Sequence, residues 1–101
     1  MSKSKEVSFK NRDRFSQLGF AILMLRRVRG MTQEQLAEKA GISRTQLSTI
    51  EAPNMPHNFT LEVFFNIADA LDVDPADLIS ASVFPDRVVN KVKDQDKDKK
   101  S

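Results

Sequence analysis

Apolar residues recur along this chain at three- and four-residue spacings, which is the pattern of helices with one buried face. No stretch alternates apolar and polar residues for long enough to indicate a sheet, so the pattern predicts an all-α fold of five short helices around one core. The predicted helices comprise residues 13–29, 33–40 and 44–51, one that follows Thr60 and a short one that follows Asp74. The residue before each of the last four is Thr, Ser or Asp, whose side-chain oxygen can accept from the free amides of a helix start.

The first predicted helix is apolar on more than one face. Its expected core stripe comprises Phe15, Leu18, Ile22, Leu25 and Val28. Phe20, Leu23 and Met24 lie off that stripe, so a second apolar face needs a cover. The candidate covers outside the five helices are Val7, Phe9, Val83, Phe84 and Val88. We hypothesise that these segments pack on the first helix and help to build a dimer, although packing within one chain fits the pattern equally well.

The later helices and the chain ends carry weaker signals. The residues expected to face inward are Leu61, Phe64, Ile67, Ala68 and Leu71, followed by Leu78 and Ile79. Val88, Val89 and Val92 give residues 86–93 a weak apolar edge, which favours an extra C-terminal helix. The expected division of the chain is a flexible basic arm at residues 1–12, a domain at residues 13–81, an extension at residues 82–93 and a disordered charged tail at residues 94–101.

Length and composition exclude several classes of protein. A chain of 101 residues has room for about one domain, which argues against a multidomain enzyme. Cysteine is absent, so disulfides, thiolate metal sites and cysteine nucleophiles are excluded together. His57 is the only histidine, so we expect no histidine-based metal site and no cofactor. The longest apolar run, residues 20–25, is far shorter than the roughly 20 residues that a membrane helix needs, and we take the protein to be cytoplasmic.

The charge is unevenly distributed along the chain, although the net charge is only +2. Residues 1–16 and residues 17–50 each carry five basic and two acidic side chains, whereas residues 51–82 carry six acidic side chains and no Lys or Arg. A basic first half suits an anionic partner such as a nucleic-acid backbone, provided that the acidic half faces away. A merely solvated charge pattern is equally compatible with these numbers.

Two short helices between residues 33 and 50 are joined by a turn of about three residues, as in a helix-turn-helix. Ala37 lies where a larger side chain would push the helices apart, and Gly41 can supply the positive φ of the turn. The apolar anchors of the pair are Leu36, Ala40, Ile42, Leu47 and Ile50. The side chains left exposed on the second helix, all able to hydrogen-bond, are Arg44, Thr45, Gln46, Ser48 and Thr49.

At these residues the sequence resembles the lambda-repressor/Cro type of helix-turn-helix, also called the xenobiotic-response-element-type transcriptional regulators. The resemblance covers about residues 18–79. It rests on Leu25-Arg26, Gly30-Met31-Thr32-Gln33, Glu34-Gln35-Leu36-Ala37, Ala40-Gly41-Ile42-Ser43, Leu47-Ser48-Thr49-Ile50-Glu51 and Ile67-Ala68-Asp69-Ala70-Leu71. It implies a five-helix lambda-repressor-like domain that binds double-stranded DNA, commonly as a homodimer on an inverted-repeat operator.

The resemblance also assigns roles to individual residues. The residues that it places against base edges in the major groove are Arg44, Thr45, Gln46 and Thr49. Of these, Arg44 best matches the two acceptors of guanine, and Gln46 could serve adenine. The residues expected to position the phosphate backbone are Gln33, Thr32, Ser43, Ser48, Asn54, His57 and Asn58. Arg26 and Glu51 correspond to a partly buried salt bridge whose role is architectural.

The sequence departs from the family between the third and fourth helices, where relatives often carry a glycine and basic residues. Residues 52–59 contain no Lys or Arg, so backbone contacts there would come from Asn54, His57, Asn58 and main-chain amides. We expect a sequence-specific regulator of transcription, acting as a repressor and without catalysis. The alternative is a protein-interaction adaptor or antitoxin-like partner that has little affinity for DNA. A small hydrolase is disfavoured because the sequence offers no nucleophile beside a histidine and no paired-carboxylate pocket.

Overall fold

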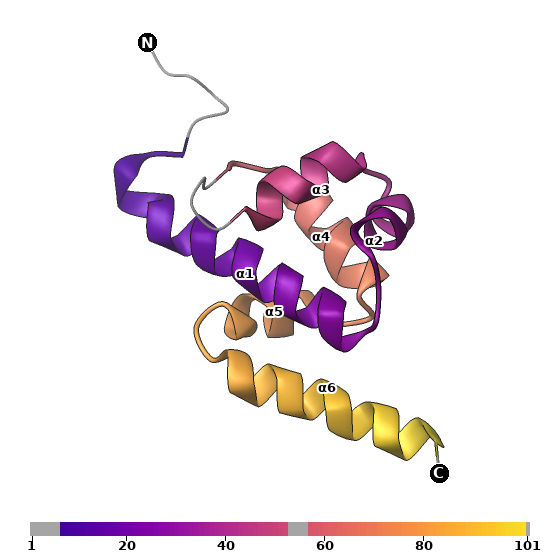
Figure 1. Cartoon of the computed structure of the whole chain (residues 1–101). Coiled ribbons are helices and arrows are strands. Elements are labelled where there is room, and N and C mark those ends of the chain that lie inside the picture. Colours follow the sequence, from indigo (N-terminus) through magenta and orange to yellow (C-terminus); the bar gives the residue numbers. More distant parts are fainter. Residues whose placement is uncertain (1–6, 53–56, 101) are drawn as a thin grey trace.

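The computed structural model describes residues 7–52 and 57–100, and all the regular structure in these ranges is helical (Figure 1). The elements in chain order are a 3-10 helix η1 (Phe9–Asn11), α1 (Arg12–Val28), α2 (Gln33–Ala40), α3 (Arg44–Glu51), α4 (Leu61–Ala70), α5 (Pro75–Ala81) and α6 (Pro85–Lys100). The all-α prediction and the extra C-terminal helix are therefore confirmed. Within the described ranges no helix is both long enough and apolar enough to cross a membrane.

The helix starts are fixed locally by side-chain caps. Thr32 and Gln35 form a reciprocal capping box at α2, in which each side chain accepts from the backbone amide of the other residue. Ser43, Thr60 and Asp74 cap α3, α4 and α5 by accepting from amides in the first turn of each helix. Pro75 at the first position of α5 needs no amide hydrogen bond there. The predicted starts of all four helices are confirmed.

Two turns bring the first three helices together. Gly30 and Gly41 follow α1 and α2 with φ values of 72° and 71°, a left-handed conformation that side chains other than glycine rarely adopt. After Gly41, the short turn to Ser43 sends α3 off at an angle to α2 (Figure 1). The pair therefore forms the helix-turn-helix that the sequence predicted.

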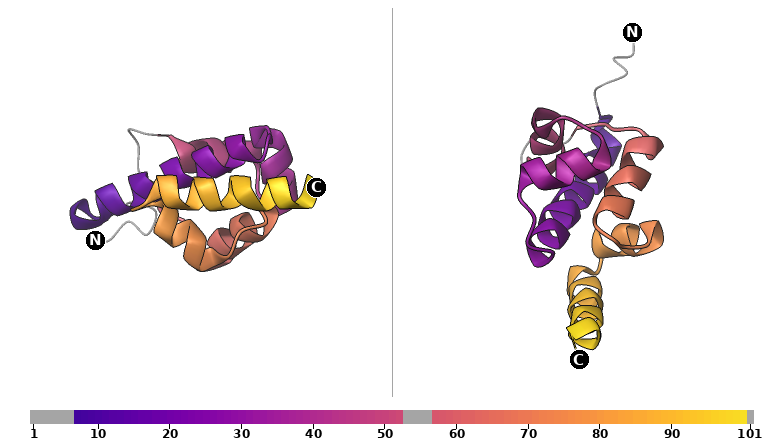
Figure 2. Two further views of the ribbon diagram at one scale, coloured as in Figure 1. Left: turned by 90° about the horizontal axis from the view of Figure 1, so that it is seen from below. Right: turned by 90° about the vertical axis from the view of Figure 1, so that its right-hand side faces the viewer.

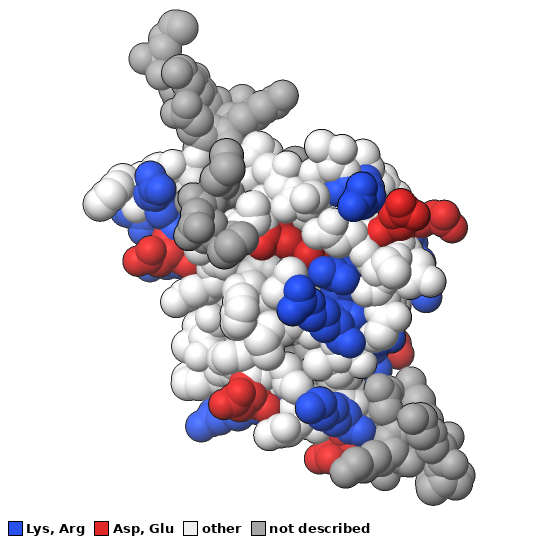
Figure 3. All heavy atoms as spheres, in the orientation of Figure 1, with Lys and Arg blue, Asp and Glu red and all other residues white. Residues whose placement is uncertain are grey.

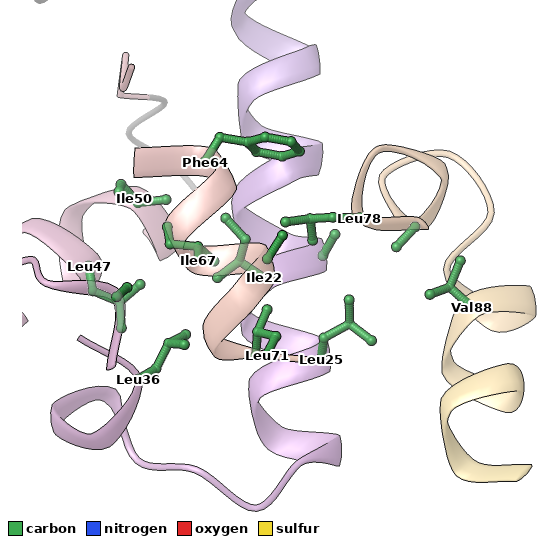
Figure 4. Packing of buried hydrophobic residues seen from close by; sticks show 14 of the residues in the cluster. Ile22, Leu25, Leu36, Leu47, Ile50, Phe64, Ile67, Leu71, Leu78 and Val88 are labelled. Atoms are coloured by element: carbon green, nitrogen blue, oxygen red, sulfur yellow. The ribbon is translucent and has the colours of Figure 1, made fainter. Parts of the chain in front are cut away.

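The core is centred on α1. Ile22 and Leu25 have no exposed surface and meet apolar side chains from the other helices (Figure 4). The partners labelled around them are Leu36, Leu47, Ile50, Phe64, Ile67, Leu71, Leu78 and Val88. Arg29 at the end of α1 donates to the carbonyl oxygens of Leu71 and Asp72, so it also closes the end of α4.

α1 and α3 approach each other most closely at Gly19. A methyl group added there would overlap the carbonyl oxygen of Ile50, so only glycine allows the two backbones to lie this near. Gly19 is buried in the middle of α1, where a glycine otherwise weakens a helix relative to alanine. Glycine at this position therefore allows the two helices to pack closely, at the cost of a lower helix propensity than alanine would give.

α6 covers the side of α1 that faces away from α2 and α3 (Figure 2). Val88, Val89 and Val92 are buried against α1 and α5. Lys91 Nζ donates to Asp77 Oδ2 at 3.1 Å, which ties α6 to α5 at the surface. Part of the second apolar face of α1 is therefore covered within one chain, while Phe20 remains half exposed beside a hollow of about 520 Å³ between α1 and the turn from α5 to α6.

Three expectations are corrected. Residues 94–100 continue α6 and are not a disordered tail, because a helix already anchored by buried valines propagates at little cost per residue. The N-terminal arm is shorter than expected, since η1 begins at Phe9 and α1 at Arg12; residues 1–6 lie outside the described residues. Leu61 and Ile79 are 69% and 50% exposed, because one lies at the first turn of α4 and the other points away from the neighbouring buried Leu78.

Gly19→Ala should destabilise the fold by about 1–3 kcal/mol, the usual cost of overpacking, even though alanine is the better helix former. The reason is that the new methyl group must push α3 away from α1. Urea unfolding measures the difference, with Gln17→Ala on the exposed side of α1 as the matched control. An alanine variant as stable as the wild type would show that the helices do not meet at this point.

Candidate nucleic-acid interface

α3 presents one face to the core and a polar face to solvent. Leu47, Ile50 and Glu51 are buried. At about 100° per residue, Thr45 and Thr49 lie opposite that buried face, in successive turns of the helix. Arg44 and Ser48 flank them on one side and Gln46 on the other. Arg44, Thr45 and Ser48 are exposed, while Gln46 and Thr49 are half-buried, so the five predicted polar residues all reach the surface of one helix.

Several of these polar groups already have a partner within the chain. Thr49 Oγ1 donates to the carbonyl oxygen of Thr45 at 2.9 Å. Ser43 Oγ accepts from the backbone amide of Gln46 at 2.9 Å, but its hydroxyl hydrogen can still donate. Thr32 Oγ1 likewise accepts from the backbone amide of Gln35. The capping side chains are therefore held in fixed positions at the starts of α2 and α3.

A surface hollow of about 450 Å³ joins the starts of these two helices. Its lining residues are Arg26, Thr32, Gln33, Glu34 and Arg44. The first amides of α2 have no acceptor within their own helix, and the helix dipole adds a positive potential at this end. The structure thus brings Gln33 and Arg44 to one hollow, in which the amides at the start of α2 and Arg44 favour an anion and the carboxylate of Glu34 opposes it.

Gln33 belongs to a buried network that links α1, α2 and α3. Arg26 Nε and Nη2 donate to the two carboxylate oxygens of Glu51 at 2.8 and 3.0 Å, a bidentate pair at nearly buried side chains. Arg26 Nη1 donates to the carbonyl oxygen of Met31 at 2.8 Å. Gln33 Nε2 donates to Glu51 Oε1 at 3.0 Å, which leaves its second amide hydrogen and its Oε1 for an external partner. The structure therefore forms the expected Arg26–Glu51 bridge and adds Gln33 to it.

The loop before α4 lies along the other flank of α3. A hollow of about 650 Å³ runs between Thr45, Gln46 and Thr49 on one wall and His57 and Asn58 on the other. The two predicted loop residues are therefore placed beside the polar face of α3. Asn54 lies outside the described residues.

On one face of the molecule the charges are less segregated than they are along the sequence (Figure 3). On the face in Figure 3, basic and acidic side chains are interspersed over the helices, and neither sign forms a continuous field. On α3 itself, Arg44 is the only cationic side chain, and Glu51 is buried in its pair with Arg26. Among the residues that the structure describes, no three His, Asp or Glu side chains gather as a metal site would require.

Sequence reasoning missed three contacts that shape this surface. The close packing at Gly19 could have been suspected from a glycine within an apolar helix segment. The bond from Gln33 to Glu51 joins residues 18 positions apart and has no signal in the sequence pattern. The Arg29 contacts with the end of α4 likewise span more than 40 residues.

Comparison with known families identifies this arrangement. A family model described as helix-turn-helix matches residues 22–78, which is more than half of the chain. The chain belongs to the helix-turn-helix family. The matched segment runs from α1 into α5 and includes the whole of α2 and α3, whereas α6 lies beyond it.

Individual relatives extend the comparison. The antitoxin HipB of Escherichia coli (strain K12) is 40% identical over 58 residues, a match that covers 57% of this chain and 64% of HipB. The restriction-modification controller protein C.AhdI from Aeromonas hydrophila superposes with a TM-score of 0.59 and 30% identity, over 63% of this chain and 94% of that structure. The wild-type restriction-modification controller protein C.Esp1396I gives a TM-score of 0.63 and 31% identity, over 76% of this chain and 93% of that structure.

Glu51→Ala should cost about 3–5 kcal/mol in the free energy of unfolding, because it leaves the buried Arg26 guanidinium without its carboxylate. Urea unfolding measures this cost, with Glu62→Ala on the exposed face of α4 as the control. The double variant Arg26→Met/Glu51→Leu should recover most of the loss, since no unpaired charge remains. Equal costs for Glu51→Ala and Glu62→Ala would contradict the buried pair.

Proposed function

We propose that this protein is a sequence-specific, double-stranded DNA-binding regulator of transcription, acting as a repressor. The observation that carries the proposal is the polar face of α3, which stands opposite a fully buried edge and lies beside the start of α2. A helix held in this way can enter the major groove while its neighbours rest on the backbone. Membership of the helix-turn-helix family and the likeness to restriction-modification controller proteins support it.

Phosphate contacts set the position of the helix in this proposal. Gln33 and the amides at the start of α2 hold one phosphate, and Thr32, Ser43 and Ser48 donate hydroxyl hydrogens to the backbone on either side. His57 and Asn58 serve the backbone along the far flank of α3, and Asn54, which lies outside the described residues, is expected to contact the backbone as well. The Gln33 amide is already oriented by Glu51, so little side-chain entropy is lost when it meets a phosphate.

Base contacts come from the exposed face of α3. Arg44 has a planar fork that matches the O6 and N7 acceptors of guanine, and the Gln46 amide matches adenine. Thr45 and Thr49 lie between them on the ridge opposite the core. Two copies of the chain would place two such helices about 34 Å apart on a near-palindromic operator.

Selection of bound sequences from random duplexes tests the proposal directly. Arg44→Ala should relax the preference at one base position in each half-site, with a loss of about 1–3 kcal/mol against the preferred base. Arg87→Ala removes the same charge from the exposed surface of α6 and should leave the selected sequence unchanged. If Arg44→Ala instead weakened every duplex equally, Arg44 would be a phosphate contact and not a reader of sequence.

The second candidate function is an adaptor that binds a protein partner, and the 40% identity to an antitoxin favours it. A salt titration separates the two functions. Even two phosphate contacts lower DNA affinity about tenfold between 50 and 200 mM salt, because counterions are released on binding. We expect at least this dependence for the selected duplex. A duplex affinity that hardly changes with salt, or no measurable affinity at all, would favour the adaptor.

A further inference from the structure

Thr49 uses its hydroxyl hydrogen inside α3. The hydroxyl donates to the carbonyl oxygen of Thr45, one turn earlier, at 2.9 Å. A threonine Cβ carries only two heavy substituents besides the backbone, and one of them is held by this bond. The other substituent is the γ-methyl group, while the hydroxyl oxygen can still accept a hydrogen bond but has no hydrogen left to donate. Thr49 therefore offers a partner a methyl group and an acceptor oxygen, but no hydrogen for an acceptor on a base edge.

The position of this methyl group on α3 suits contact with a base edge in the major groove. Thr49 lies opposite the buried edge of the helix, on the same ridge as Thr45. It borders a small hollow of about 180 Å³ that it shares with Arg44, Thr45 and Ser48, and also the larger hollow that His57 closes on the other flank. A base edge that follows this ridge passes Thr49, and an acceptor such as thymine O4 finds no free hydroxyl hydrogen there.

We infer that Thr49 reads the 5-methyl group of a thymine by apolar contact. In the major groove only thymine carries a methyl group, so a threonine methyl selects it against the other three bases without any hydrogen bond. Contact between the two methyl groups would remove apolar surface of both from water, which is the source of the expected affinity. The inference rests on the proposed function and adds to it which chemical group one residue recognises.

Deoxyuridine gives a direct test, because it differs from thymidine only by the missing methyl group. Duplexes are selected with the wild-type chain, and each thymine of the selected site is then replaced in turn by deoxyuridine. We expect one position in each half-site at which the replacement weakens wild-type binding about fourfold, the value of one buried methyl group. Fluorescence anisotropy at fixed salt measures these affinities.

Two variants of Thr49 separate the methyl group from the hydroxyl group. Thr49→Ser keeps the hydroxyl and should lose about fourfold in affinity together with its sensitivity to deoxyuridine at that position. Thr49→Val keeps the methyl and should retain both the affinity and the sensitivity. Thr45→Ser is the control on the same ridge and should remain sensitive at the Thr49 position. Far-UV circular dichroism and urea unfolding establish that all three variants fold.

The opposite pattern would overturn the inference. If Thr49→Val lost affinity while Thr49→Ser kept it, the hydroxyl group would be the reader. The inference would also be overturned if no position of the selected duplex showed two effects together: weaker wild-type binding with deoxyuridine, and no such weakening with Thr49→Ser. The DNA-binding function would remain intact in that case. Failure to select any duplex would instead overturn the proposed function, and the inference with it.

Discussion

The bidentate pair between Arg26 and Glu51 fixes the position of α3. It joins the last turn of α1 to the last turn of α3, and Gln33 adds the first turn of α2 to the same carboxylate. A salt bridge buried to this degree contributes little net stability, because both charges lose their water. Its value is geometric, since the fork and the carboxylate meet in one orientation only. The hollow formed by Gln33 and Arg44 depends on that orientation.

The close approach of α1 and α3 at Gly19 works together with this pair. Because Gly19 has no side chain, the carbonyl group of Ile50 packs closely against the α1 backbone. The buried residues of α3 then pack into the core. Glu51 then lies where the Arg26 fork can reach it. The face opposite the core, with Thr45 and Thr49, is directed outward as a consequence. Backbone packing and one charged pair thus orient α3, which also packs against α2.

Sequence reasoning predicts the local part of this structure well, because local signals decide it. Thr32 and Ser43 cap the helices where a polar side chain precedes an apolar repeat, and Gly41 supplies the turn. What the sequence does not contain is which of several available partners a side chain takes. Thr49 can bond to a base or to its own helix, and only the coordinates show that Thr45 accepts its hydroxyl. The extent of α6 was also missed, because burial of Val88 supports a helix well beyond the buried residues.

α6 supports α1, although it lies outside the segment that the family model matches. Residues 20–25 of α1 are all apolar, so α3 and α5 cannot bury this segment alone, and Val88 and Val92 cover part of the remaining face. Lys91 and Asp77 hold α6 against α5 at the edge of this contact. α1 is therefore packed on both sides, by α6 on one and by α3 on the other. Because Arg26 of the pair with Glu51 belongs to α1, the packing of α1 also holds α3, the helix proposed to read the groove, in place.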